Sequence, residues 1–101
     1  MAQHIGLQRE GERGEVLVHY APEGIPLEVL EVAPRHSACV RFIDPYGDTV
    51  FNQLQLPVLI GEFEEMAKDA ANAQVRDRLE SVVAFLAASQ GIHQYVRFVG
   101  D

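Results

Sequence analysis

Two carboxylates, Asp44 and Asp48, lie four residues apart in the segment D-P-Y-G-D, and Asn52 follows four residues later. Oxygen ligands of this kind can share a hard cation, and neighbouring carboxylates can act as general acid and base. The spacing is not that of a calcium-binding loop, and turn formation already explains Asp44. A small ligand-binding protein or hydrolase that uses Asp44 and Asp48 is therefore the second alternative for function.

The remaining reactive side chains are the single cysteine, Cys39, and four histidines, His4, His19, His36 and His93. The histidines show neither H-x-H nor H-x-x-x-H spacing, so we expect no metal and no cofactor. Cys39 is expected in a strand, where a packed thiol is normally inert, although the last strand could bring His93 beside it. No serine lies in a G-x-S-x-G motif. These patterns favour a protein without catalysis.

The charge of the chain is strongly negative, at −7 with eight basic residues that are scattered along the sequence. Nucleic-acid binding needs clustered Lys and Arg, so we expect no nucleic-acid partner. The acidic excess lies in residues 1–34 and 57–81. The first alternative for function is an inhibitor or immunity-like protein that captures a basic partner. Its acidic surface would consist of Glu10, Glu12, Glu15, Glu62, Glu64, Glu65 and Asp69.

The length of 101 residues with 48% hydrophobic content is enough for one core, so a single domain over residues 1–101 is expected. No run of about 18 apolar residues is present, and the start of the chain lacks the pattern of a signal peptide. We therefore expect no membrane partner and a cytoplasmic location. A lone cysteine agrees with a reducing compartment.

The elements that would position these side chains centre on a predicted β-hairpin. Val40 and Phe42 alternate with a polar residue before the D-P-Y-G-D turn, and Thr49 and Phe51 alternate after it. Within the turn, Asp44 can accept a hydrogen bond from the backbone two residues on. The sequence predicts two antiparallel neighbours joined by a tight reversal.

Two amphipathic helices are predicted after this hairpin. Pro57 suits the first turn of a helix, and apolar residues recur from Leu59 onward at three- and four-residue spacing. Asn72 marks the break before the second helix, and Gly91 ends that helix. The stripe of the second helix consists of Val75, Leu79, Val82, Val83 and Leu86.

Further strands are expected on both sides of this unit. Short strands are predicted around Ile5–Leu7 and over residues 16–20, and a final strand over residues 92–99. Residues 27–33 are ambiguous between a strand and a helical turn, and flanking prolines favour a strand. The predicted fold class is α+β, with a mostly antiparallel sheet of four to six strands. Two C-terminal helices pack on one face, and the last strand follows them.

The faces of the predicted sheet divide the strand residues into two sets. The side chains expected under the helices are Val16, Val18, Val40, Phe42, Val96 and Phe98. The opposite face would be open and would mix apolar, aromatic and arginine side chains, a composition typical of interface cores. Its predicted interface residues are Leu17, His19, Arg41, Ile43, His93, Tyr95 and Arg97, with Cys39 and Val99 beside them.

This open face leads to the main functional hypothesis. We expect a small, acidic, soluble accessory protein that acts as a protein-interaction module without catalysis. Two-fold dimers are the commonest soluble oligomers, so the expected partner is a second copy in a homodimer, or another protein.

Overall fold

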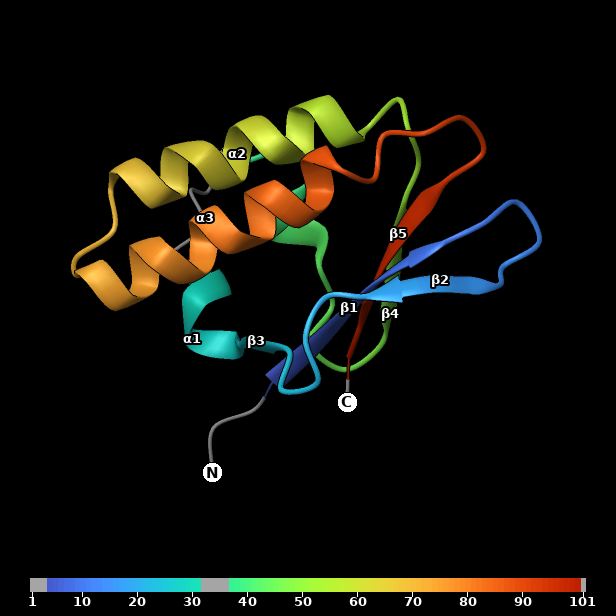
Figure 1. The fold of residues 1–101 in the computed structure, drawn as a ribbon. Helices are drawn as coiled ribbons and strands as arrows, with labels where there is room; N and C mark the ends of the chain where they lie inside the picture. Colours follow the sequence, from blue (N-terminus) through green and yellow to red (C-terminus); the bar gives the residue numbers. More distant parts are fainter. Residues whose placement is uncertain (1–3, 32–36, 101) are drawn as a thin grey trace.

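The computed structural model describes residues 4–31 and 37–100, which form an antiparallel sheet with helices packed on it (Figure 1). The strands are β1 (His4–Glu10), β2 (Val16–His19), β3 (Ile25–Pro26), β4 (Asp48–Phe51) and β5 (Tyr95–Val99). The helices are α1 (Leu27–Leu30), the 3-10 helix η1 (Val40–Phe42), α2 (Leu56–Lys68) and α3 (Ala73–Ala87). The predicted α+β class is confirmed.

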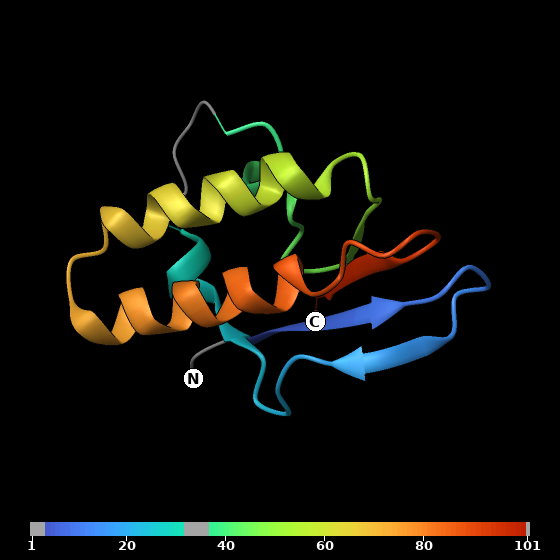
Figure 2. The same ribbon diagram turned by 45° about the horizontal axis from the view of Figure 1, so that its top comes forward.

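The sheet has the strand order β2-β1-β5-β4, and β3 pairs with the first residues of β1. The last strand, β5, therefore follows the helices in sequence and lies between β1 and β4 in space. Figure 2 shows α2 and α3 side by side on one side of the sheet. The predicted helical layer and the predicted final strand are both confirmed, although β5 begins at Tyr95 rather than at Ile92.

The two long helices begin where the sequence signals lie. Pro57 occupies the first turn of α2, where its missing N–H has no helical partner to lose. Asn72 is the N-cap of α3, because its side-chain oxygen accepts a hydrogen bond from the Val75 N–H at 2.9 Å. Both helices turn an apolar stripe inward, and the buried residues are Leu56, Leu59, Phe63, Met66 and Ala67 of α2 and Leu79, Val82 and Leu86 of α3.

The core between the helices and the sheet centres on Phe98 of β5, which is fully buried. Its ring stacks on Phe63 of α2 with centroids 6.3 Å apart, and it meets Phe51 of β4 edge-on at 5.8 Å. Both arrangements are favourable for aromatic pairs. Phe98 thus connects the helical layer to the sheet.

The predicted hairpin is wrong in its first half. Residues 40–42 form the 3-10 helix η1, and the partner of β4 is β5. The carboxylate of Glu62, from α2, accepts the backbone N–H groups of Ala38, Cys39 and Val40. These three N–H groups therefore need no partner on a neighbouring strand. The alternation of side chains in the sequence does not show where backbone N–H groups find their acceptors. The predicted turn is present, but it joins η1 to β4.

The preference for a strand over residues 27–33 is also wrong for its described part. Residues 27–30 form the short helix α1, directly after the two-residue strand β3. Val29 and Leu30 are buried in this helix, so packing against the core outweighs the β propensity of Val29. Residues 32 and 33 lie outside the described part of the chain.

Three of the six residues predicted under the helices are exposed. Val16 and Val18 lie on β2, the edge strand, and are 46% and 42% exposed. Phe42 of η1 is 60% exposed. Strand β2 lies beyond the part of the sheet that α2 and α3 cover (Figure 2), so both of its faces stay accessible. Val40, Val96 and Phe98 are buried as predicted.

The turn between β2 and β3 depends on Gly24, which has a φ of +70°. A Cβ there would lie 2.6 Å from the backbone oxygen of Ile5. Gly24→Ala is therefore expected to lower the free energy of unfolding by about 2 kcal/mol, because strain and a backbone clash add together. Chemical denaturation checks this. The matched control is Gly14→Ala, where φ is +82° but nothing lies within 4 Å. Its cost should be about 1 kcal/mol, and equal costs would contradict the clash.

Candidate functional site

The face of the sheet that α2 and α3 do not cover carries a row of side chains from four strands. Cross-strand partners share a face, so the pairs Gln8↔His19, Gln8↔Arg97 and Val50↔Arg97 place these four residues in line. Their neighbours in sequence, such as Phe98 and Phe51, are buried on the helical side. We call this the outer face. It contains the predicted interface residues His19, Tyr95 and Arg97, the last two only partly exposed.

The centre of the outer face is an ion-pair network around Glu10. Arg97 donates from Nε to Glu10 Oε2 at 2.6 Å and from Nη2 to Oε1 at 3.3 Å, and Gln8 donates to Glu10 Oε2 at 2.6 Å. Arg97 also donates to Asp48 at 3.1 Å. Glu10 is 4% exposed although it lies on the outer face. The hydrogen bond from Arg97 holds the pKa of Glu10 below its ordinary value of 4.5, against the effect of desolvation.

Strand β2 is irregular at the edge of the outer face. Arg9 is opposite Val18 and Glu10 is opposite Val16, so Leu17 is an extra residue, a β-bulge. A bulge interrupts the ladder and re-aims side chains, which makes the free edge of β2 a poor template for an added strand. Leu17 itself is 47% exposed. A partner molecule would therefore contact the side chains of β2 rather than its backbone edge.

Three of the predicted interface residues are not part of the sheet. Ile43 is buried in the core, which contradicts its predicted place on the open face. Arg41 is exposed on η1, where its guanidinium lies 4.7 Å from the ring centroid of Phe42. His93 is exposed in the turn before β5 with a φ of 60°. The predicted patch therefore reduces to Leu17, His19, Tyr95 and Arg97.

The thiol of Cys39 is buried, and desolvation raises its pKa, with the nearby Glu62 carboxylate adding to the effect. Its predicted place on the open face is wrong. His93 lies on an exposed turn and Cys39 next to η1, so the sheet does not bring this pair together by strand pairing. Over residues 4–31 and 37–100, no group of three His, Cys, Asp or Glu side chains could hold a metal ion. His36 lies outside this part.

The two carboxylates of the D-P-Y-G-D segment serve different partners. Asp44 Oδ1 accepts the Tyr46 N–H at 2.8 Å, as the turn prediction requires, and Asp48 pairs with Arg97. Three clefts lie on the described part of the structure: one beside α3, a smaller one beside Tyr95 and another between α2 and α3. Neither Asp44 nor Asp48 lines any of these three. The geometry thus gives no support to a hydrolytic site at Asp44 and Asp48.

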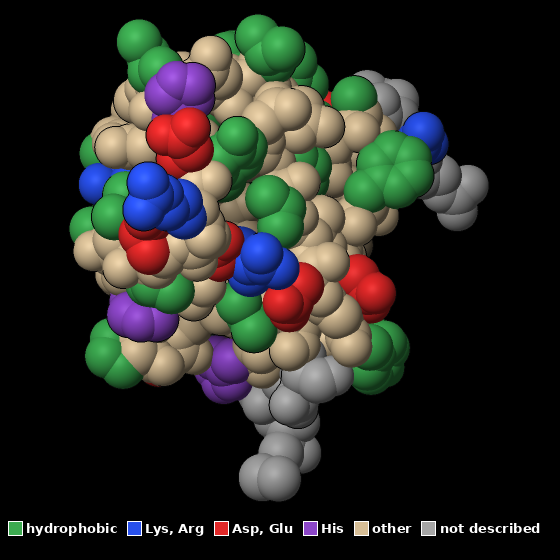
Figure 3. All heavy atoms as spheres, turned by 90° about the vertical axis from the view of Figure 1, so that its right-hand side faces the viewer, with side chains coloured by type: hydrophobic (Ala, Val, Ile, Leu, Met, Phe, Trp, Pro, Cys, Tyr) green, Lys and Arg blue, Asp and Glu red, His purple; other side chains and the backbone are tan. Residues whose placement is uncertain are grey.

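The seven acidic residues proposed to meet a basic partner are spread over the molecule. Two of them have internal roles, since Glu10 pairs with Arg97 and Glu62 caps η1. Glu12 and Glu15 are exposed in the β1–β2 turn, the exposed Glu64 and Glu65 lie on α2, and the exposed Asp69 is the C-cap of α2. Figure 3 shows acidic and basic side chains next to one another on the side of the molecule that faces right in Figure 1. On that side they form no continuous acidic patch.

The cleft beside α3 is the feature that the sequence did not suggest. It has a volume of about 810 Å³ and lies between α3 and the segment from Tyr20 to Val29. Arg78 of α3 donates to the backbone oxygen of Gly24 across this cleft. The one available signal is the spacing of Gln74, Arg78 and Ser81, which places three polar side chains on one face of a helix.

No protein-family model, no curated protein and no solved structure matches this chain. In the described part of the chain, no helix is long and apolar enough to cross a membrane.

Proposed function

We propose that this chain is a non-catalytic protein-interaction module that self-associates through the outer face of its sheet, with a second copy as the partner. One observation carries the proposal. All four residues of β2 are exposed, and two apolar ones adjoin on the outer face. Val16 lies opposite Glu10, with the bulge residue Leu17 next to it, and they are 46% and 47% exposed, whereas Val18 lies opposite Arg9 on the helical side. Scattered apolar residues are normal on a surface, but adjoining exposed apolar residues on one face are typical of a contact region.

The composition of the outer face supports a protein partner. It combines the apolar Val50 and Val99 with Tyr95 and Arg97, two residue types that are enriched at interfaces. The Glu10–Arg97 pair is already formed within one chain, so a partner would not have to neutralise Glu10. The bulge at Leu17 favours contact between side chains of the two faces over addition of a strand.

The alternative of capturing a basic partner is less well supported. Its acidic residues lie on separate elements, and Glu10 and Glu62 are engaged inside the chain. A two-fold interface places the same surface on both copies, so it needs no opposite charge on a partner. Self-association is therefore the hypothesis that we take to experiment.

The Leu17→Lys variant tests this proposal. Two lysines would meet near the two-fold axis or lose their water at the contact, so the dimer dissociation constant should rise by about tenfold or more. Sedimentation equilibrium over a range of protein concentrations measures it. Because Leu17 is already half exposed in one chain, the fold should tolerate the change.

The matched control is Phe42→Lys. Phe42 is more exposed than Leu17, at 60%, but it lies on η1 and not on the sheet. This variant should dimerise like the natural chain. A natural chain that stays monomeric at millimolar concentration, or a Leu17→Lys variant that dimerises as well as Phe42→Lys, would reject the proposal.

A further inference from the structure

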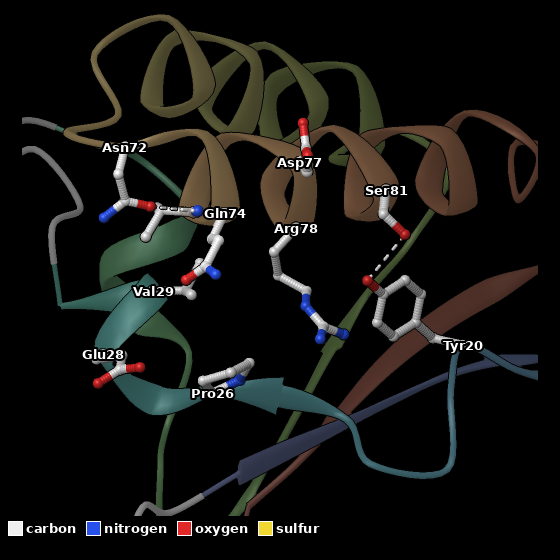
Figure 4. A pocket seen from close by; sticks show the side chains of 10 residues that line it. Tyr20, Pro26, Glu28, Val29, Asn72, Gln74, Asp77, Arg78 and Ser81 are labelled. Atoms are coloured by element: carbon white, nitrogen blue, oxygen red, sulfur yellow. Dashed lines mark hydrogen bonds between the residues drawn. The ribbon is translucent and has the colours of Figure 1, made fainter.

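The cleft beside α3 is large enough to hold a small molecule. Its volume of about 810 Å³ falls within the range of about 300 to 1,000 Å³ that is common for ligand pockets. It lies between α3 and the segment that holds β3 and α1 (Figure 4). The self-association proposed above uses the outer face of the sheet, so a ligand in this cleft would not compete with it.

The charge around the cleft is negative. Its lining contributes the carboxylates of Glu28 and Asp77 and the guanidinium of Arg78. A third carboxylate, that of Glu23, lies 3.8 Å from Arg78 Nη1 and offsets the charge of this arginine. Asp77 points away from the cleft in Figure 4, so it adds to the negative potential without contacting a ligand. The potential in the cleft therefore favours a cation over an anion.

The guanidinium of Arg78 is held at one end of the cleft. Its Nη1 donates a hydrogen bond of 3.3 Å to the backbone oxygen of Gly24, in the turn before β3. At the same end, the Tyr20 hydroxyl donates to Ser81 at 2.9 Å. Arg78, Ser81 and Tyr20 all lie to the right of Pro26 in Figure 4. The other end of the cleft is therefore free of the guanidinium.

That other end of the cleft offers hydrogen-bond acceptors beside an apolar surface. Glu28, in the first turn of α1, and Gln74 of α3 lie below and above Val29 in Figure 4. Within the described part of the chain, neither side chain has a hydrogen-bond or ion-pair partner, so their oxygens are available to a ligand. The surface between them is apolar and is formed by Pro26, the buried Val29 and Val75.

We propose that this cleft binds a small primary amine with an apolar body. The ammonium group, which is protonated at neutral pH, donates hydrogen bonds to the carboxylate of Glu28 and to the amide oxygen of Gln74. The apolar body lies on Pro26 and Val29. The cleft supplies the shape, its floor supplies the apolar contact, and the two acceptors orient the ligand.

Three probes with one apolar body and different end groups test the proposal. They are 3-phenylpropylamine, 3-phenylpropanol and 3-phenylpropionate, added to the isotopically labelled chain at constant ionic strength and followed by two-dimensional amide NMR. The amine should shift the signals of Glu28, Val29 and Gln74 in a saturable manner. The alcohol should bind about threefold more weakly or worse, because it loses the charge-assisted hydrogen bond at an exposed carboxylate. The carboxylate should bind most weakly. Equal binding of the alcohol, tighter binding of the carboxylate, or no saturable shift of these signals would overturn the proposal.

Substitution of Glu28 gives an independent check. Glu28→Gln should weaken the binding of 3-phenylpropylamine by about threefold or more, because it removes the charge from the acceptor. The matched control is Glu31→Gln, since Glu31 is an exposed carboxylate at the C-cap of α1 that does not line the cleft. Both variants change the net charge equally, and both should fold because the two side chains are exposed. Unchanged binding by Glu28→Gln would contradict the assignment. An equal loss in Glu31→Gln would contradict it too, because the amine would then be attracted by acidic surface in general.

Discussion

Arg97→Met is expected to lower the free energy of unfolding by about 2 to 3 kcal/mol, because it leaves a buried carboxylate without its cation. Glu10 is 4% exposed, and two of its hydrogen bonds come from Arg97. Breaking a fully buried pair costs about 3 to 5 kcal/mol. We expect less here because the Arg97 side chain is 31% exposed, so water already screens one partner. Urea denaturation of the natural chain and of Arg97→Met measures the difference in the free energy of unfolding.

A double-mutant cycle separates the energetic effect of losing the Glu10–Arg97 ion pair from the effect of losing the packing of the Arg97 side chain. Adding Glu10→Gln to Arg97→Met removes the unpaired charge, so the double variant should be more stable than Arg97→Met alone. The control is Asp48→Asn, because Asp48 also pairs with Arg97 but is 48% exposed. Its cost should stay below about 1 kcal/mol. A loss in Arg97→Met no larger than that of Asp48→Asn would contradict the role of Glu10.

The pH dependence of stability provides a second measurement of the same pair. The pKa of Glu10 is lower in the folded chain than its ordinary value of 4.5, so the unfolded chain binds the proton first as the pH falls. The stabilisation by Glu10 is therefore complete above this ordinary value and is lost as the pH falls through the folded pKa. In Arg97→Met this part of the acid dependence should disappear, since its largest cause is removed.

Local patterns predicted the helices well because their determinants lie within a few residues. The apolar spacing from Leu59 to Phe63 and Met66, the proline at position 57 and the cap at Asn72 are all local, and α2 and α3 follow them. The buried alternation of Val96 and Phe98 was found in the same way. Such signals identify a helix or a strand, but they do not show which other elements pack against it.

The features that sequence reasoning missed depend on contacts between distant residues. Val40 and Phe42 alternate as in a strand, yet the backbone donors before them are satisfied by Glu62, more than twenty residues later in the chain. Glu10 and Arg97 are separated by 87 positions, so neither the pair nor the burial of Glu10 could be read from composition. The exposure of Val18 reflects the strand order, which puts β2 at the edge.

The sequence predicted only part of the outer face, because contacts between distant residues decide which segments join the sheet. Alternation placed Leu17, His19, Tyr95 and Arg97 together correctly, because these residues lie on true strands. It failed for Arg41 and Ile43, because the segment that carries them is not in the sheet. The cleft around Arg78 joins α3 to residues 20–29, so its existence depends on a tertiary contact that no local pattern encodes.

Glu62→Ala is expected to lower the free energy of unfolding by about 2 kcal/mol and to loosen η1. The Glu62 carboxylate accepts the N–H groups of three successive residues, with distances of 3.0 Å to Cys39 and 2.9 Å to Val40. A buried N–H that loses its partner costs about 1 to 3 kcal/mol. Water can reach part of this segment, since Ala38 is exposed, so the total is smaller than the sum over three donors. Urea denaturation measures the loss, and amide hydrogen exchange at residues 38–40 should become faster.

The matched control is Glu64→Ala, which removes an equally charged but exposed carboxylate from the same helix. This change should alter stability by no more than about 0.5 kcal/mol. Glu62→Gln should fall between the two, because an amide keeps one acceptor oxygen and loses the charge. If Glu62→Ala and Glu64→Ala cost the same, and exchange at residues 38–40 stays slow, then η1 is held by the burial of Val40 rather than by the carboxylate.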